Sequence, residues 1–357
     1  MAKFHVAVTG LNTGESPCPG VGVIRSLKQA TGDEVRIIGL TYELLNGASY
    51  VDHLVDEVYS VPFPQNDEEK YLKRIKEIAK KTKINVFIPS LDFEIAPLSN
   101  LESALKDLGI RLLLPSETTV SLCKKERLPR LSELTGIDVP FTVILRDRRE
   151  IVTSASYFAY PFVIKAAAGD GCIVYTLEEA IVFSNRLSAH WGWPLIMQSY
   201  IKGDEFSVAA LADQKHEVVG SVCMKKILKS KNGNTWIGSS AKDENLIKLT
   251  QKVIKKVKWE GPMEIEFIKD PDSRRYFLIE INPRFPSWIE LVAKAGCNLP
   301  MALVKTAFSQ KVKPFSSYRS GILFARSGMY TTCDVTRLGQ LATKEEIIYN
   351  GHNHSKN

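Results

Sequence analysis

The segment from 262 to 288 constrains the fold of this chain more than any other stretch. Two runs typical of β-strands, MEIEFI and YFLIEIN, flank the polar sequence DPDSRR, whose Asp, Pro and Ser favour a turn, so the pattern predicts a β-hairpin. Alternate residues of a strand share a face. We therefore expect Glu264 and Glu266 to point the same way on the first strand. Glu280 and Asn282 should do so on the second.

These side chains predict a cluster of hard oxygen ligands. Mg²⁺ prefers carboxylate and amide oxygens when it also holds substrate phosphates. Arg284 would bring a planar guanidinium, suited to phosphate or carboxylate, into the same space. The alternative is a solvated acidic face. Glu280 favours the ligand cluster, because it lies inside the apolar run 277–281, where an unpaired charge would be costly.

Composition indicates a soluble globular protein that acts on small molecules. The 357 residues suffice for two or three domains, with 44% hydrophobic and 24% charged residues. The net charge of +7 is spread along the chain without a basic-aromatic patch, which suits anionic small substrates and argues against nucleic acid. The chain opens directly as a strand and has no apolar run that could span a bilayer. We therefore expect a cytoplasmic protein without membrane contact.

The cysteines predict neither a zinc site nor a redox pair. They are far apart and form no C-x-x-C pattern, which is typical of reduced thiols in a cytosolic protein. The roles of two of them, Cys18 and Cys172, stay open. The full set is Cys18, Cys123, Cys172, Cys223, Cys297 and Cys333.

Strands and helices alternate over the first 116 residues, at the spacing of an open parallel α/β sheet. Runs 4–9, 35–42, 55–61, 84–90 and 110–116 are the expected strands. The Gly-rich turn after the first strand is not G-x-G-x-x-G, so a tight crossover explains it as well as a dinucleotide site does. Asp92 follows the strand 84–90, where open α/β sheets bind ligands.

The middle of the chain places lysines beside small-residue segments. A helical run over 118–135 carries Lys124 and Lys125, and Gly136 closes it. The strand PFVIK ends at Lys165, just before the loop 166–172, where a lysine and backbone N–H groups could hold a phosphate. A surface lysine at a hairpin tip is the better explanation if this stretch is taken alone.

Farther on, the composition predicts loops, strands and a tail. Residues 229–241 are polar and rich in Gly, Ser and Asn, which indicates a mobile loop. Residues 318–332 should form a final strand pair, and the tail should be disordered.

Together, these motifs resemble the ATP-grasp superfamily over nearly the whole chain, most of all the branch that includes carbamoyl-phosphate synthase and biotin carboxylase. Lys125, 11 residues before Gly136 and 15 before Pro140, matches the first phosphate-binding basic residue of the family. Lys165 matches the second, which contacts the α- and β-phosphates from the lid. Glu205 matches the carboxylate that binds the ribose hydroxyls. The hinge whose backbone pairs with adenine matches Gln198, Ser199, Tyr200 and Ile201.

The resemblance also assigns the metal ligands and a catalytic arginine. Glu266, Glu280 and Asn282 match the Mg²⁺ ligands, with the E-x-N-P-R signature at 280–284. This implies ATP and two Mg²⁺ ions, or Mn²⁺ in their place, with Glu280 bridging them, and it leaves Glu264 outside the ligand set. Arg284 would hold the carboxylate or the acyl phosphate. Lys226 and the segment 229–241 are further candidates, for contact with the transferring phosphoryl group or with the second substrate.

The implied architecture is α/β with a mixed α+β character. It comprises an N-terminal Rossmann-like domain with an open parallel sheet (1–116), a lid subdomain (117–196) and a large subdomain with an antiparallel sheet and the metal site (197–310). C-terminal strands (311–346) would complete the core, and a disordered tail (347–357) would follow.

The implied activity is an ATP-dependent ligase that joins a carboxylate to an amine and forms ADP. Its partners would be small-molecule or peptide substrates, and relatives make a homodimer an option. A carbamoyl-phosphate-forming or carboxylase-type enzyme is disfavoured by Ser287, which stands where carbamoyl-phosphate synthase has a second arginine. The expected single ATP-grasp unit and the lack of a biotin-attachment motif point the same way. A non-catalytic ATP-binding regulatory protein is the remaining alternative, and the intact ligand set argues against it.

Overall fold

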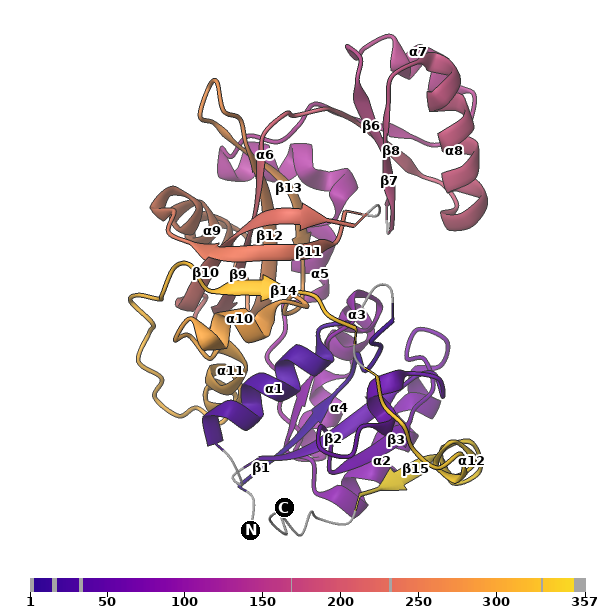
Figure 1. Cartoon of the computed structure of the whole chain (residues 1–357), viewed down its shortest axis with the longest axis vertical. Coiled ribbons are helices and arrows are strands. Elements are labelled where there is room, and N and C mark those ends of the chain that lie inside the picture. The colour runs from indigo at the N-terminus through magenta and orange to yellow at the C-terminus, as the bar shows by residue number, and fades with distance from the viewer. Residues whose placement is uncertain are drawn as a thin grey trace.

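A computed structural model describes residues 3–14, 18–31, 35–167, 169–230, 233–328 and 330–349 of the chain. Sheets of five, six and four strands organise these residues. Figure 1 shows an N-terminal domain at the bottom, a large antiparallel sheet in the middle and a small domain at the top. Residues 350–357 of the predicted disordered tail lie outside the described residues. No helix within the described ranges is long and apolar enough to cross a membrane.

The N-terminal domain has the predicted open parallel α/β sheet. Its strands are β1 (Phe4–Val8), β2 (Val35–Thr41), β3 (Glu57–Ser60), β4 (Val86–Ile88) and β15 (Glu346–Ile348). The order is β15-β3-β2-β1-β4, and all pairings except that of β15 are parallel. Around the sheet lie α1 (Gly20–Thr31), η2 (Gly47–Tyr50), α2 (Glu68–Thr82), α3 (Asp92–Asn100) and α4 (Glu102–Asp107). The run 110–116, expected as a closing strand, makes a single bridge from Arg111 to Val86 instead.

The helical run predicted over 118–135 is interrupted, and the interruption positions Lys125. It consists of α5 (Glu117–Leu122), a 3-10 turn η3 (Lys125–Arg127) and α6 (Leu128–Thr135). Pro129 lies in the first turn of α6, where its missing N–H is tolerated, and it favours a new helix start here. Gly136 ends α6 in the left-handed conformation at φ 63°, as the sequence predicts.

The small domain is a four-stranded antiparallel sheet with two helices on it. Its elements are β5 (Thr142–Leu145), α7 (Glu150–Ala155), β6 (Phe162–Ala166), β7 (Gly171–Val174), α8 (Leu177–Trp191) and β8 (Leu195–Ser199). The strand order is β5-β8-β6-β7. Its hydrophobic core runs from Leu145 to Met197 in sequence, whereas Leu128 and Leu131 of α6 pack into the core of the large sheet. The lid therefore begins later than the predicted residue 117.

The large sheet is antiparallel throughout, with the order β13-β12-β9-β10-β11-β14. Its strands are β9 (Asp204–Ala212), β10 (Val218–Lys229), β11 (Thr235–Ala241), β12 (Gly261–Lys269), β13 (Tyr276–Asn282) and β14 (Leu323–Ala325). Three helices accompany it: α9 (Glu244–Val257), α10 (Ile289–Lys294) and α11 (Leu299–Ala307). The mobile loop expected over 229–241 is wrong for most of its length, because β11 pairs with both β10 and β14.

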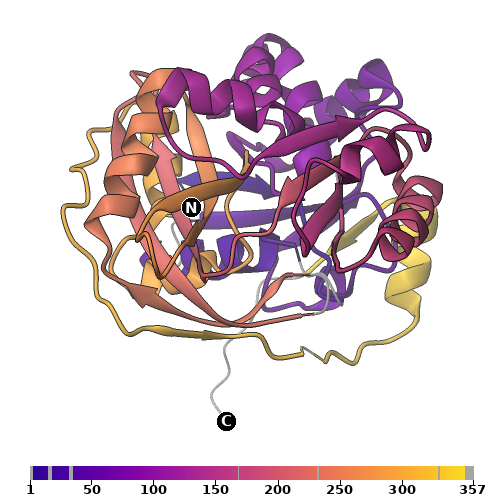
Figure 2. The same cartoon turned by 90° about the horizontal axis from the view of Figure 1, so that it is seen from above.

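The two faces of the large sheet have different partners. Val208 and Cys223 point to one face and pack with α9 and α6 in one core. Ala209, Val222 and Met224 point to the other face and pack with β1, α1 and α11, which joins the sheet to the N-terminal domain. Figure 1 shows the large sheet above the N-terminal domain, and in the view from above in Figure 2 its strands form a curved band.

The C-terminal segment connects the large sheet to the N-terminal domain. Of the strand pair expected in 318–332, only β14 forms in the described residues, and it extends the large sheet. The chain then forms a helix that was not expected, α12 (Thr336–Lys344), and ends its described part at β15 beside β3. Phe324 of β14 and Ile347 of β15 contribute to the same hydrophobic core, although their strands belong to different sheets. Residues 347 and 348, expected in the disordered tail, are part of β15.

Candidate active site

Hydrogen-bonded register brings the predicted metal ligands together on one face of the large sheet. Glu266 of β12 stands opposite Glu280 of β13 on one side and Ser207 of β9 on the other. Directly opposed residues share a face, so these three side chains form one row. Asn282 lies two residues beyond Glu280 and opposite Glu264. The alternation predicted for both strands of the hairpin is therefore confirmed.

A β-bulge lies next to this row. The pairing shifts between Glu266 and Phe267, because Phe267 pairs with Leu278 and Ile279 is the extra residue. Bulges re-aim neighbouring side chains and are common beside active sites. Here the bulge allows Glu280 to face the site while Leu278 and Ile281 remain in the core on the opposite face.

Lys125 lies at the break between α5 and α6 and contacts this carboxylate row. Its Nζ lies 3.0 Å from Oε1 of Glu280, and it also donates to the carbonyl oxygen of Gly169 in the lid at 3.4 Å. Burial opposes the charges of both groups, but their attraction outweighs it. As a result the pKa of Lys125 is raised and that of Glu280 is lowered. The first predicted phosphate-binding lysine therefore lies beside the predicted bridging carboxylate.

Lys226 occupies the other end of the row. Its Nζ lies 2.6 Å from Oε2 of Glu266 and 3.7 Å from Oε2 of Glu205, and only 5% of its side chain is exposed. Burial raises the pKa of Glu266 to about 7 against the opposing effect of Lys226. Glu205 also forms an ion pair with Lys229. The predicted ribose carboxylate thus lies within the same charged cluster.

Lys165 approaches the cluster from the lid. Its side chain has no hydrogen bond or ion pair to any other described residue, and burial lowers its pKa even though Glu280 acts in the opposite direction. Its stem crosses Gly171, where a Cβ would lie 2.8 Å from Lys165 Cγ. Glycine is therefore required at this position by the close approach. A half-buried cation whose side chain has no anionic partner among the described residues is the arrangement expected of a group that meets a phosphate.

Arg284 bridges the large sheet and the N-terminal domain. Its Nε lies 3.2 Å from Oδ2 of Asp92, at the start of α3, and its Nη1 lies 3.2 Å from Oε2 of Glu264. Nη1 also donates to the carbonyl oxygen of Phe285. Nη2 has no partner among the described residues and is the part of the guanidinium that can meet an anion. Asp92, singled out beyond its strand, thus reaches the site.

The predicted hinge lies where the lid meets the large sheet. Gln198 is buried, its backbone is paired on both sides, and its Nε2 donates to Oγ1 of Thr142 at 3.1 Å. Ser199 ends β8, and Tyr200 and Ile201 lie in the connector to β9, outside the strand pairing. Adenine recognition by this backbone stays a prediction.

The oxygen atoms of the row fit Mg²⁺. Asn282 donates its Nδ2 to Glu264 at 3.2 Å, which leaves the carbonyl oxygen Oδ1 for a cation. The hydroxyl of Ser207 is buried without a partner among the described residues. No three His, Cys, Asp or Glu side chains in the described part of the chain could hold a metal by themselves. The donor set is therefore two carboxylates and one amide oxygen, and phosphate oxygens would supply other ligands.

A cavity of about 1040 Å³ adjoins the cluster through Cys18 and Ser287. The thiol of Cys18 interacts electrostatically with Arg284, and burial raises its pKa to about 11. The cavity is formed by the loop after β1, by α1 and α10, by the ends of β10 and β11, and by β14 with the residues that follow it. Its polar lining includes Arg25, Lys229, Ser230, Asn234, Glu290, Lys294 and Arg326, and its apolar lining includes Val21, Leu228, Trp236, Leu291, Leu323 and Phe324.

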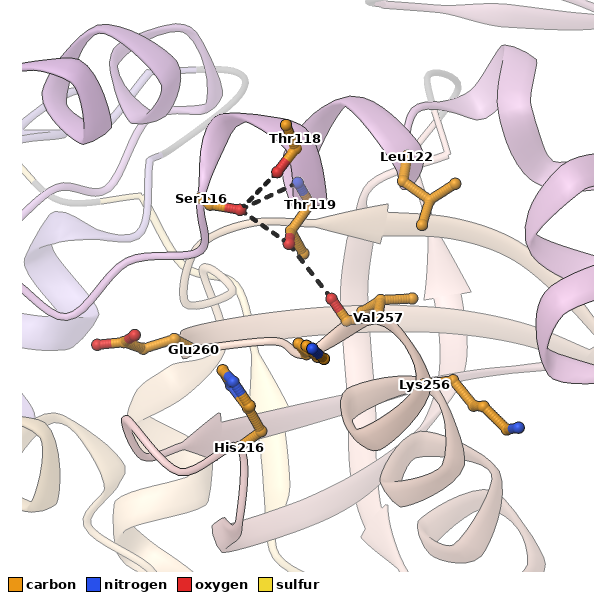
Figure 3. A pocket seen from close by; sticks show the side chains of 9 residues that line it. Ser116, Thr118, Thr119, Leu122, His216, Lys256, Val257 and Glu260 are labelled. Atoms are coloured by element: carbon orange, nitrogen blue, oxygen red, sulfur yellow. Dashed lines mark hydrogen bonds between the residues drawn. The ribbon is translucent and has the colours of Figure 1, made fainter.

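Figure 3 shows a second cavity, of about 450 Å³. Neither cavity is lined by a predicted site residue, but two lining residues of the larger one interact with such residues: Lys229 with Glu205 and Cys18 with Arg284. Ser116, Thr118 and Thr119 line it and bond to one another, and Thr119 also donates to the carbonyl oxygen of Val257. We place the functional site in the larger cavity and the charged row beside it.

Comparison with known proteins agrees with this fold. Residues 193–325 match the family model described as ATP-grasp in the biosynthetic pathway with Ter operon. The carbamoyl phosphate synthase large chain of Clostridium acetobutylicum is 25% identical over 289 residues, which cover 74% of this chain and 26% of that protein. This chain therefore spans about a quarter of the length of that relative.

Solved structures show the same fold. The biotin carboxylase domain dimer of 2-oxoglutarate carboxylase from Hydrogenobacter thermophilus, in complex with MgADP, ADP and bicarbonate, superimposes with a TM-score of 0.66 at 19% identity, covering 86% of this chain and 70% of that one. L-amino acid ligase from Bacillus licheniformis gives 0.63 at 16% identity, covering 88% and 78%. The chain has the ATP-grasp fold and contains an ATP-grasp domain that is homologous to the carbamoyl phosphate synthase large chain.

Sequence reasoning missed Lys294, which lines the cavity from α10. Trp236 lines the cavity from the segment 229–241, which the sequence had indicated as a candidate for substrate contact. Glu264, which the resemblance leaves outside the ligand set, contacts both Asn282 and Arg284. Strand alternation had already put Glu264 beside Glu266 in the candidate cluster, but it gave Glu264 no role apart from that of a ligand.

Proposed function

We propose that this chain is an ATP- and Mg²⁺-dependent ligase that activates a carboxylate as an acyl phosphate for attack by an amine. The observation that carries the proposal is the convergence of Lys125, Lys165 and Lys226 on the row of Glu266 and Glu280. Phosphoryl transfer requires positioning and charge neutralisation more than covalent chemistry by the protein, and this row provides both.

The proposed reaction has two chemical steps. In the first step a carboxylate oxygen of the substrate attacks the γ-phosphorus of ATP. The bond from the γ-phosphorus to the β,γ-bridging oxygen then breaks, and ADP leaves. Lys125 and Lys165 would hold the phosphates, and Arg284 would orient the carboxylate through Nη2. In the second step an amine attacks the acyl carbon, inorganic phosphate leaves, and the amine loses a proton.

Glu266, Glu280 and Asn282 would hold Mg²⁺, either as two ions or with Mn²⁺ as a substitute. When bound, the metal neutralises charge on the phosphate oxygens. The lid that carries Lys165 would exclude water, because water hydrolyses an acyl phosphate. We place the carboxylate and amine substrates in the cavity of about 1040 Å³, whose lining reaches Cys18 and Ser287 beside Arg284. Because the Hydrogenobacter relative is a domain dimer, we also propose a homodimer.

The test is the release of ADP and phosphate from Mg-ATP over a matrix of amine and carboxylate pairs. We expect release with particular pairs only, together with a product that joins both. Glu280→Ala should abolish it, whereas Asp272→Ala, in the turn of the same hairpin, should leave it unchanged. ADP release with bicarbonate alone would favour a carboxylase-type enzyme. Nucleotide binding without release for any pair would favour the regulatory alternative.

A further inference from the structure

Glu264 is the centre of a buried polar network beside the metal row. Only 6% of the residue is exposed. Its Oε1 accepts from Nε1 of Trp288 at 2.8 Å, and its Oε2 accepts from Asn282 Nδ2 and Arg284 Nη1, each at 3.2 Å. One carboxylate thus contacts a predicted metal ligand, the predicted anion-binding arginine and a buried tryptophan.

These contacts make Glu264 a poor metal ligand. Both lone pairs of Oε2 are engaged, and Oε1 already accepts the indole N–H. A buried carboxylate is costly unless it is paired and hydrogen-bonded, and Arg284 supplies the opposite charge here. The three donors account for the burial of Glu264 without a cation.

The contact with Asn282 fixes which end of its amide faces the row. An amide has a donor end and an acceptor end, and a carboxylate can pair only with the donor end. Glu264 therefore holds Nδ2 and turns Oδ1 toward any cation bound by Glu280. A neutral partner at 264 could pair with either end, which would allow the amide to rotate and present N–H groups to the metal.

The contact with Arg284 leaves one nitrogen of the guanidinium for an anion. Glu264 and Asp92 hold Nη1 and Nε from two sides, so Nη2 is the nitrogen directed elsewhere. The side chain of Asp92 is 53% exposed and that of Glu264 only 8%, so Glu264 is the more firmly placed of the two. Partners of this kind fix ligand orientation, and their loss typically weakens metal affinity or activity about 10- to 100-fold.

We propose that Glu264 is a positioning residue that orients Asn282 for the metal and Arg284 for the substrate anion. This inference rests on the proposed function, because it assigns Glu264 a role only if Asn282 and Arg284 bind Mg-ATP and substrate. Sequence resemblance placed the ligand at Glu266, and the network gives Glu264 a separate task.

The primary test is calorimetric titration of the full chain with ATP, with and without Mg²⁺. Glu264→Gln should weaken ATP binding about tenfold when Mg²⁺ is present and change it less than about twofold when Mg²⁺ is absent. The phosphate-binding lysines are intact in both cases. Asp272→Asn makes the same change of charge in the exposed turn of the hairpin and should leave both affinities unchanged.

A double variant that exchanges the carboxylate and the amide of residues 264 and 282 tests the orientation of the side chain at 282 directly. In the double variant E264Q/N282D, the Gln amide donates to the new carboxylate, which keeps the hydrogen bond, the net charge and an oxygen ligand at 282. We expect it to recover most of the Mg²⁺-dependent affinity lost in E264Q, as a coupling between the two sites. A merely structural role for Glu264 predicts additive losses instead.

Nuclear magnetic resonance of the metal-free protein provides a readout independent of binding. The indole N–H signal of Trp288, assigned by its absence in Trp288→Phe, should move upfield in E264Q because its acceptor is weaker. A shifted indole signal with unchanged Mg²⁺-dependent affinity would overturn the positioning role while leaving the proposed function intact. Wild-type protein that binds ATP without any Mg²⁺ dependence would overturn both.

Discussion

The Nζ atom of Lys226 lies 2.6 Å from Oε2 of Glu266. The side chain of Lys225, the preceding residue of β10, lies on the opposite face of the strand. Lys225 forms an exposed ion pair with Asp204, so two adjacent lysines have different surroundings. The strand alternation that separates them provides a matched pair of variants.

Lys226→Ala should lower ATP turnover at least about tenfold, because it removes a cation from the phosphoryl-transfer row. It should also lower the free energy of unfolding by about 3 kcal/mol, since it leaves Glu266 buried without its partner. Lys225→Ala should change stability by less than about 1 kcal/mol, as expected for an exposed pair, and should retain turnover. Steady-state kinetics and urea unfolding measure both; equal losses in the two variants would contradict the assignment.

Glu94 should make stability depend on pH. Burial raises its pKa from the ordinary 4.5 to about 7, although Thr9 and Tyr42 donate to it. Between these values the folded chain binds a proton that the unfolded chain does not, so the free energy of unfolding falls as pH rises. The effect is worth about 3 kcal/mol.

Glu94→Gln keeps a neutral side chain at that position and should remove this contribution. We expect the loss of stability between pH 5 and pH 8 to be about 3 kcal/mol smaller in the variant than in the wild type. Urea unfolding at the two pH values measures the difference. Parallel pH profiles for the two proteins would show that Glu94 is not protonated in the fold.

The last described strand should stabilise the N-terminal domain. Ile347 is 3% exposed in the core shared with β1 and α1, whereas its neighbour Ile348 is 57% exposed. Ile347→Ala should cost about 2–4 kcal/mol, and Ile348→Ala less than about 0.5 kcal/mol. Thermal unfolding distinguishes them, and equal melting temperatures would mean that β15 does not pack as described.

Cysteine alkylation should report burial at the cavity. Cys333 is exposed, whereas Cys18 is half-buried near Arg284, and this burial raises the pKa of its thiol to about 11. Since the thiolate is the reactive species, iodoacetamide at pH 7.5 should modify Cys333 well before Cys18. Mass spectrometry of the timed digest measures the order, and early labelling of Cys18 would show that this wall of the cavity is open.

Much of the fold followed from local patterns. Residue type and short-range spacing predicted three features: the parallel direction of β1 to β4, the hairpin of β12 and β13, and the left-handed end of α6 at Gly136. The errors occurred where long-range pairing decided. Residues 235–241 have a loop-like composition yet form β11, because β10 and β14 pair with them on both sides. The run 110–116 has strand composition but makes only one bridge.

The sequence by itself determined which residue types could serve the site, because alternation along two strands sets Glu264, Glu266, Glu280 and Asn282 on their faces. Only the tertiary structure decided what each of them contacts. Lys125 comes from the break between α5 and α6, Lys165 from the lid and Asp92 from the N-terminal domain. These residues are far from the hairpin in sequence, so no local pattern predicts their contacts with it. The different roles of Glu266 and Glu264 depend on these long-range contacts. Glu266 pairs with Lys226, whereas Glu264 accepts hydrogen bonds from Trp288 and Arg284.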